Sequence, residues 1–209
     1  MKTQRLVSTL IASTALTLLA VAPAAADNHL LLELEGGVTT AVGGSGDAEP
    51  GHAIGATFGI GGRIPGFSPA YYLVGRVAAA DHGLRGPEVY GGPAIERDQS
   101  EWALGARIYL PISERLRALF QIAAGETSDT SDVKYYGERP LRYESELFTI
   151  FTEAGLQYRF TNNFSLGAVA DLAYFPDQAP FDMTARSAGM EDGGEFGRAR
   201  FAVTTTFHF

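Results

Sequence analysis

The sequence predicts an all-β protein: an eight-stranded antiparallel up-and-down β-barrel that crosses a membrane, preceded by an N-terminal signal peptide. Three observations lead to this prediction. The chain begins with an apolar leader, eight later segments alternate apolar with polar residues, and the connections between them alternate between short and long. Together they divide the 209 residues into a signal peptide, residues 1–26, and one barrel domain, residues 27–209.

The leader has the three parts of a secretory signal peptide. Lys2 and Arg5 form a basic region, residues 6–21 are largely apolar, and residues 24–26 are alanines that supply a cleavage site. A transmembrane anchor is the alternative, but roughly 16 apolar residues fall short of the ~20 that a spanning helix needs. We therefore expect export through the Sec pathway and cleavage near Ala26.

The composition excludes several classes of function. Without the leader, 14 basic residues face 24 acidic residues, a net charge of −10, which disfavours nucleic acid as a partner. The absence of cysteine excludes disulfides, thiolate metal sites and a cysteine nucleophile. All of these basic residues except Lys134 are arginines, whose forked side chains suit buried pairing with carboxylates, so we expect an internal charge network.

Eight segments alternate apolar with polar residues at a period of two, as strands do when each face meets a different environment. They are residues 30–38, 54–61, 71–78, 102–110, 116–123, 148–159, 164–174 and 200–209. Tilted transmembrane strands need about 9–11 residues. One such segment would also suit a soluble sandwich, so the prediction depends on the repetition and on glycines that share the charged face.

The connections support a barrel with two different ends. Residues 63–69, 111–115 and 161–163 form short turns, whereas residues 43–51, 81–100, 127–146 and 176–197 form long loops. Short periplasmic turns and long external loops are typical of outer-membrane barrels. Residues 135–143 or 181–196 could hold an additional hairpin, which leaves a ten-stranded barrel open.

The last strand carries the clearest signature. Its outward residues are Phe201, Val203, Thr205, Phe207 and Phe209. This segment resembles the C-terminal strand of bacterial outer-membrane barrels, and residues 158–167, YRFTNNFSLG, resemble the strand, turn and strand of the small porin-like barrels related to outer-membrane proteins A and X. The resemblance implies an outer-membrane location, insertion by the barrel-assembly machinery, contact with membrane lipid and lipopolysaccharide, and a monomer.

If the alternation holds, ten charged side chains point into the barrel. They are Glu33, Glu35, Arg76, Arg107, Arg117, Glu153, Arg159, Asp171, Arg198 and Arg200. Those expected at mid-height are Glu35, Arg76, Arg107, Glu153, Asp171 and Arg200. An eight-stranded interior is barely wide enough for side chains, so the charges should interlock as a plug, with hydrogen bonds from Tyr109, Gln121 and Gln157. A gate that opens when the pairs exchange is the alternative.

Aromatic residues are expected where the barrel meets the two membrane surfaces. The candidates are Tyr71, Trp102, Tyr158, Phe160 and Tyr174.

The predicted function is that of an integral outer-membrane protein with a structural or surface-interaction role and an unknown extracellular ligand. A narrow porin or gated channel is the first alternative, and a lipid A-modifying enzyme is the second. No catalytic residue, cofactor or metal site is predicted. His52, His82, Asp81 and Ser100 match no serine hydrolase motif, and the acidic stretches 128–132 and 191–195 lack the spacing of a calcium loop.

Overall fold

The computed structural model describes residues 30–43, 47–63, 69–85, 94–134, 140–187 and 195–209. The predicted signal peptide, residues 1–26, lies outside the described residues. Within the described ranges, no helix is long and apolar enough to cross a membrane.

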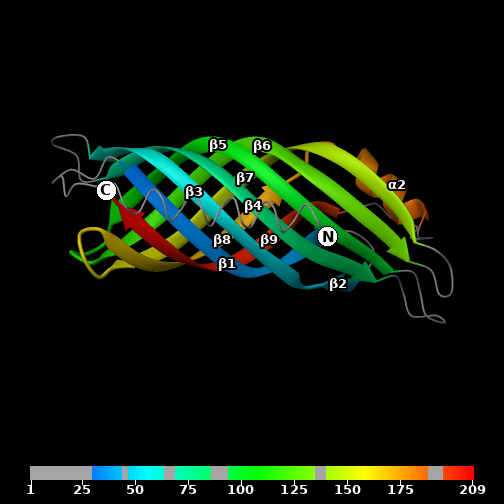
Figure 1. The fold of residues 1–209 in the computed structure, drawn as a ribbon, viewed down its shortest axis with the longest axis horizontal. Helices are drawn as coiled ribbons and strands as arrows, with labels where there is room; N and C mark the ends of the chain where they lie inside the picture. The colour runs from blue at the N-terminus through cyan, green and yellow to red at the C-terminus, as the bar shows by residue number, and fades with distance from the viewer. Residues whose placement is uncertain (1–29, 44–46, 64–68, 86–93, 135–139, 188–194) are drawn as a thin grey trace.

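Strands dominate the described residues, as the alternating pattern predicts, and within these residues one helix interrupts them (Figure 1). The elements are β1 (Leu30–Gly43), β2 (Asp47–Glu49), β3 (Gly51–Arg63), β4 (Ala70–Arg85), β5 (Ala94–Pro111), β6 (Leu116–Lys134), β7 (Leu141–Arg159), β8 (Phe164–Tyr174), α2 (Ala179–Ser187) and β9 (Glu195–His208).

Apart from the short β2, each strand pairs antiparallel with the next one in the sequence, and β9 pairs back onto β1, which closes the barrel. β2 lies one residue before β3 and pairs with the same strand, β4, so it is a continuation of β3 beyond Pro50. When β2 and β3 are counted as one, the barrel therefore has eight strands. The eight-stranded prediction is confirmed and the ten-stranded alternative is wrong, because residues 181–187 belong to α2 and residues 141–143 extend β7.

The two ends of the barrel differ. The connections β3–β4, β5–β6 and β7–β8 lie at one end together with the C-terminus; we call this the turn end. Its turns are tight: Ile112 N donates to Leu116 O at 2.9 Å and Phe160 N donates to Phe164 O at 3.0 Å. We call the opposite end, where α2 lies, the hairpin end (Figure 1).

The prediction of long loops at the hairpin end is partly wrong. β5 to β7 contain 18 or 19 residues, whereas β8 contains 11. Most of segments 81–100 and 127–146 continues these strands with unbroken register. We call the additional part, residues 79–85, 94–101, 127–134 and 141–147, the projecting sheet. At about 3.3 Å per residue it extends roughly 25 Å past the end of β8.

Helix α2 covers the inner face of the projecting sheet. It begins after Asp177, whose Oδ1 accepts a hydrogen bond from Ala179 N at 3.1 Å, an N-terminal capping contact. Its Ala185 packs with Leu84, Ile95 and Val133. Its Phe181 packs in a second cluster, which includes Leu147 and Phe151. The segment 176–197, expected as a loop, therefore contains a helix held by apolar contacts.

The outward face of the barrel carries a continuous zone of exposed apolar side chains, which we call the belt. On β7 the belt runs from Phe148 to Tyr158 and on β8 from Phe164 to Tyr174. Exposed apolar residues that continue it on other strands are Ile54, Ile60, Leu73, Trp102, Leu104, Phe120, Ile122, Phe201 and Val203.

Candidate functional site

The interior holds a column of buried charged side chains from β1 and β4 to β9. The inward face of β3 carries only small residues, which leaves room for them: Gly51, Ala53, Gly55, Thr57, Gly59 and Gly61. Gly55 is needed for this reason, because a Cβ there would overlap Glu35 Oε1. The small wall of β3 thus admits long side chains from the other strands.

Arg200 and Arg76 form the centre of the column. Arg200 contacts both oxygens of Glu35, pairs with Asp171, and lies 3.5 Å from Glu153 Oε2. Arg76 pairs with Asp171 at 2.8 Å and with Glu101 at 3.2 Å. Both guanidinium groups are almost fully buried, so each is surrounded by carboxylates rather than by water.

Arg107 continues the column toward the turn end. Its guanidinium lies 2.8 Å from Glu33 Oε1 and 3.0 Å from Glu153 Oε1. Its Nε donates to Gln121 Oε1 at 2.7 Å and its Nη1 donates to Tyr109 OH at 3.1 Å. Gln157 Nε2 then donates to Glu33 Oε2 at 2.6 Å. The three neutral side chains predicted to add hydrogen bonds, Tyr109, Gln121 and Gln157, all do so.

Toward the hairpin end, the column continues through Arg198, which the sequence predicted, and through four residues that the sequence analysis did not select. Arg198 contacts both carboxylate oxygens of Glu101 at 2.9 Å and donates to Gln99 Oε1 at 2.8 Å. Gln99 donates to Asp129 Oδ1 at 2.9 Å, and Arg97 pairs with Asp129 Oδ2 at 3.2 Å. The Arg97 guanidinium also lies 4.4 Å from the centre of the Phe181 ring of α2.

Positive and negative charges nearly balance along this column. Among the described residues, the paired set comprises the arginines at 76, 97, 107, 198 and 200 and the carboxylates of Glu33, Glu35, Glu101, Asp129, Glu153 and Asp171. Arg117 adds a sixth guanidinium, which neutral side chains hold. Taking a charge out of water costs several kcal/mol unless partners and hydrogen bonds compensate. A column of paired charges supplies that compensation.

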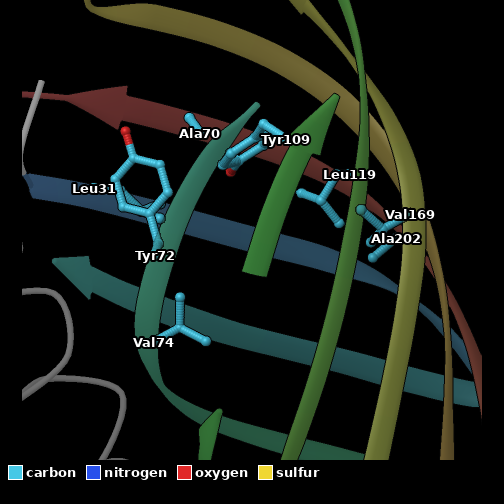
Figure 2. Close-up of a cluster of buried hydrophobic side chains, with 8 residues drawn as sticks. All are labelled: Leu31, Ala70, Tyr72, Val74, Tyr109, Leu119, Val169 and Ala202. Carbon is cyan, nitrogen blue, oxygen red and sulfur yellow. The ribbon is translucent and has the colours of Figure 1, made fainter. Parts of the chain in front are cut away.

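Apolar side chains fill the interior around the charges. One cluster combines Leu31, Ala70, Tyr72, Val74, Tyr109, Leu119, Val169 and Ala202 (Figure 2). The rings of Tyr72 and Tyr109 meet edge to face with centroids 5.7 Å apart. At the turn end His208 packs against both tyrosines. The interior is thus a packed core in which charged and apolar layers interlock.

Two of the ten predicted interior charges lie outside the ion-pair network. Arg117 is half-buried, donates to Gln157 and Ser165, contacts His208, and stacks 4.2 Å from the centre of the Tyr109 ring. Arg159 lies at the turn end and donates to the backbone oxygen of Glu114 at 2.9 Å. The other eight are buried and paired with opposite charges.

The residues that were missed carry a recognisable signal. Glu101, Gln99 and Arg97 continue the inward alternation of Ala103 and Arg107, but the predicted strand begins at Trp102. Asp129, which the sequence analysis placed in the long loop 127–146, is only 3% exposed. Extending the period of two past the end of the apolar pattern would have found these residues.

The predicted interface aromatics all point outward and are exposed: Tyr71, Trp102, Tyr158, Phe160 and Tyr174. In the last strand, Phe201 and Val203 are exposed on the belt, while Thr205, Phe207 and Phe209 are half-exposed. Tyr158, Phe160, Phe164 and Phe207 form a chain of ring contacts near the turn end. In the part of the chain that the structure describes, no group of three or more acidic or histidine side chains is arranged to hold a metal ion.

The outward face of the projecting sheet is acidic. Asp81 and Asp98 lie directly opposite each other, an unfavourable arrangement for like charges. Partial burial and the nearby carboxylates of Asp81, Asp132 and Glu96 raise the pKa of Asp98 above its ordinary value. In contrast, Arg142 donates two hydrogen bonds to Asp132, at 2.8 and 2.7 Å, and these lower the pKa of that carboxyl.

Comparison with known proteins identifies the architecture. No family model matches the chain, and no curated protein matches it. Among solved structures, Neisserial surface protein A is 11% identical, with a TM-score of 0.54, over 88% of this chain and 100% of that chain. Ail, the attachment invasion locus protein of Yersinia pestis, is 12% identical, with a TM-score of 0.51, over 87% of this chain and 99% of that chain. The chain therefore has the fold of the small outer-membrane β-barrels.

Proposed function

We propose that this protein is an integral outer-membrane barrel with a closed interior, exported through the Sec pathway after removal of residues 1–26, whose role is exerted by the projecting sheet at the cell surface. One observation carries the proposal: along the same strands, the outward face changes from apolar in the belt to charged in the projecting sheet. On β7, Phe148 to Tyr158 point apolar groups outward, but beyond Phe148 the outward residues are Glu146, Glu144 and Arg142.

The inward face stays buried along the same strands and keeps polar groups. On β5, Arg107 lies inside the belt, and in the projecting sheet Arg97, Gln99 and Glu101 are buried beside the apolar Ile95. A protein surrounded by water alone has no reason to change the polarity of its outward face along continuous strands. A barrel that passes from hydrocarbon into water must do so, because its outer face changes solvent at that level.

The belt has the height that this proposal needs. β8 runs from Phe164 to Tyr174 with aromatic rings at both ends, and its 11 residues match the ~9–11 of a tilted transmembrane strand. In this orientation the turn end faces the periplasm and the hairpin end faces the outside. Lipid and lipopolysaccharide contact the belt, and the C-terminal residues Phe201 to Phe209 serve as the signal for the barrel-assembly machinery.

The packed interior supports a plug rather than a pore. Arg76, Arg107 and Arg200 are each held by at least two carboxylates, and apolar side chains fill the remaining space. No catalytic role is assigned to any of these groups.

The projecting sheet is the part that supports a surface role. β7 pairs with β6 along its whole length but with β8 only from Ile150. Among the described residues, no strand pairs with the other edge of residues 141–149. Such an edge offers unpaired backbone groups to which an extended peptide can add as a further strand. The exposed carboxylates of Glu144 and Glu146 would favour a peptide with basic side chains. The names of the two similar structures, a surface protein and an attachment protein, are consistent with such a role.

Reconstitution of the mature protein into lipid vesicles tests the proposal. We expect heat-modifiable migration on a gel, insertion with protease cleavage confined to the hairpin end, and no steady conductance across planar bilayers. Extended basic peptides should bind the inserted protein, and replacing Glu144 and Glu146 by lysine should abolish that binding. Failure to insert, or a steady conductance in the unaltered protein, would contradict the proposal.

A narrow gated channel is the second candidate, and it has one observation in its favour. Arg76 and Arg200 both contact Glu35 and Asp171. Each guanidinium therefore has two carboxylates within 3.5 Å and can exchange one ion pair for the other. Single-channel recordings of Arg76→Ala and Glu153→Ala test this candidate. A current in either variant would support a gate, whereas the absence of current in both variants would contradict the gate and support a plugged interior.

A further inference from the structure

We infer that the belt contains a binding groove for one acyl chain of a phospholipid from the leaflet at the turn end. The inference rests on the proposed membrane insertion and goes beyond it, because it assigns a specific lipid site to one part of the wall. The groove has a volume of about 640 Å³ and lies over β5 to β8. Pockets for small ligands have volumes of about 300–1,000 Å³.

The shape of the groove comes from small outward side chains between large ones. Ala106, Thr152, Ala154 and Ala170 lie in it, and Phe120 stands directly opposite Ala154 in the β6–β7 register. On β8, Ala170 lies midway between the aromatic residues Phe164 and Tyr174. The groove therefore opens within the belt, where only hydrocarbon or another membrane-embedded surface can reach it.

The groove also lies over the most highly charged part of the interior. Arg107, Glu153 and Asp171 contribute to its lining, although their side chains are buried in the ion-pair network. The wall between hydrocarbon and buried charges is thus thin here. An apolar chain in the groove adds an apolar layer over this thin part of the wall. It also excludes water from the backbone of these strands, and this exclusion strengthens the buried ion pairs on the inner side.

An exposed basic side chain near the groove indicates the leaflet. At its β4 margin the groove includes Tyr71, one residue from the start of that strand at the turn end, and on β8 it reaches Leu172. Near the turn end, the exposed Arg115 guanidinium donates to Tyr158 OH at 3.3 Å. Tyr158 pairs with Leu116, four residue pairs from Phe120 and Ala154, which corresponds to about 13 Å along the strands. A lipid phosphate beside Arg115 can therefore extend its chain into the groove.

A second copy of the chain is a less suitable occupant. The groove is lined by 13 residues, whereas a stable protein interface uses about 20–30 residues from each partner. Thr152 carries the only hydroxyl among the small residues of the groove, so few polar groups are available to orient a partner barrel. A flexible hydrocarbon chain fits such a narrow, apolar depression without directional contacts.

Photo-crosslinking of the full mature protein tests the inference. p-Benzoylphenylalanine is introduced in place of Phe120, a large side chain that already lines the groove, or in place of Phe201 on the lipid-facing side of β9 as a control, in membranes that contain both phospholipid and lipid A. We expect a phospholipid adduct at position 120 that is about tenfold more abundant than at position 201, which corresponds to roughly 1.4 kcal/mol. Equal adducts, a lipid A adduct or a crosslinked dimer at position 120 would overturn the inference.

A second measurement uses variants that fill the groove. Native mass spectrometry of Ala154→Phe and Ala170→Phe should show loss of one retained phospholipid, and Val203→Phe should retain it. Arg115→Gln should weaken retention while leaving the groove open. Equal retention in all variants contradicts the groove. The heat-modifiable gel shift of the same samples reports insertion separately, so failure of the lipid site is distinguishable from failure of the membrane proposal.

Discussion

The belt and the projecting sheet are built from the same strands, but their outward faces differ in polarity. Inside the belt, β6 turns Phe120 and Ile122 outward and Gln121 inward. Further along the strand, Ser128 and Thr130 point outward, while Asp129 and Val133 are both buried inside. The backbone alternation does not change; only the surroundings of the outward face change. The difference shows that the solvent around each segment, rather than strand geometry, determines whether the outward face is apolar.

The charge column of the belt should respond most strongly to mutation. Arg200→Met removes the cation that contacts Glu35, Asp171 and Glu153 together, and we expect a loss of about 3–5 kcal/mol of stability, as for other broken buried pairs. Urea unfolding in detergent, followed by the fluorescence of Trp102, measures it. Arg159→Met at the turn end is the control and should cost under ~1 kcal/mol. Similar losses in both variants would refute the central position of Arg200.

In the projecting sheet, the corresponding core is the contact with α2. Phe181 is fully buried against Phe175 and the Arg97 guanidinium. Phe181→Ala should cost about 3–5 kcal/mol of helix docking, seen as faster protease cleavage near α2 while the barrel still resists unfolding. Met183→Ala on the same helix is the control and should leave the cleavage rate unchanged, because Met183 is 59% exposed. Unchanged cleavage in Phe181→Ala would show that other contacts hold the helix.

One type of substitution, to arginine, placed on the outward face of both regions tests the change in outward polarity directly. Ile122 and Thr130 lie on the same face of β6, inside and beyond the belt. Ile122→Arg should destabilise the inserted barrel by about 2–4 kcal/mol, since an arginine would face hydrocarbon. Thr130→Arg should change stability by about 0.5 kcal/mol or less, because the side chain faces water. Equal effects in vesicles would contradict the assigned membrane boundary.

The smallest effect concerns pH and belongs to the projecting sheet alone. Because the pKa of Asp98 is raised in the folded protein, its contribution to stability is present below the pKa of the unfolded chain and is lost as pH rises through the folded value. Asp132, whose pKa is lowered, contributes in the opposite sense: its stabilisation is lost as pH falls.

Asp98→Asn should therefore stabilise the projecting sheet slightly at neutral pH and leave it unchanged in acid, where Asp98 is already protonated. Protease cleavage rates of the inserted protein, recorded from about pH 3 to pH 7 around the ordinary aspartate pKa, measure this effect. A variant that behaves like the unaltered protein at every pH would show that the Asp81–Asp98 repulsion is negligible.

Much of the candidate site could be predicted because side-chain direction in a strand has a strict period. Glu33, Glu35 and Arg200 follow that period from the apolar pattern of their own strands, and all three are buried. Glu101 follows the same period, but it lies where the apolar pattern ends, so it was not assigned to a strand. Arg159 has the correct parity, yet it lies at the rim, where the backbone oxygen of Glu114 replaces a carboxylate partner.

The sequence by itself determined eight alternating segments, the inward or outward direction of their side chains and the presence of a charged interior, because these depend on local alternation. Tertiary structure decided between eight and ten strands and which charges meet, since the stagger between strands brings Arg198 to Glu101 and Arg97 to Asp129. It also decided that α2 covers the projecting sheet and that small residues of three strands form one groove. Such contacts join residues distant in sequence, and only closure of the barrel brings them together.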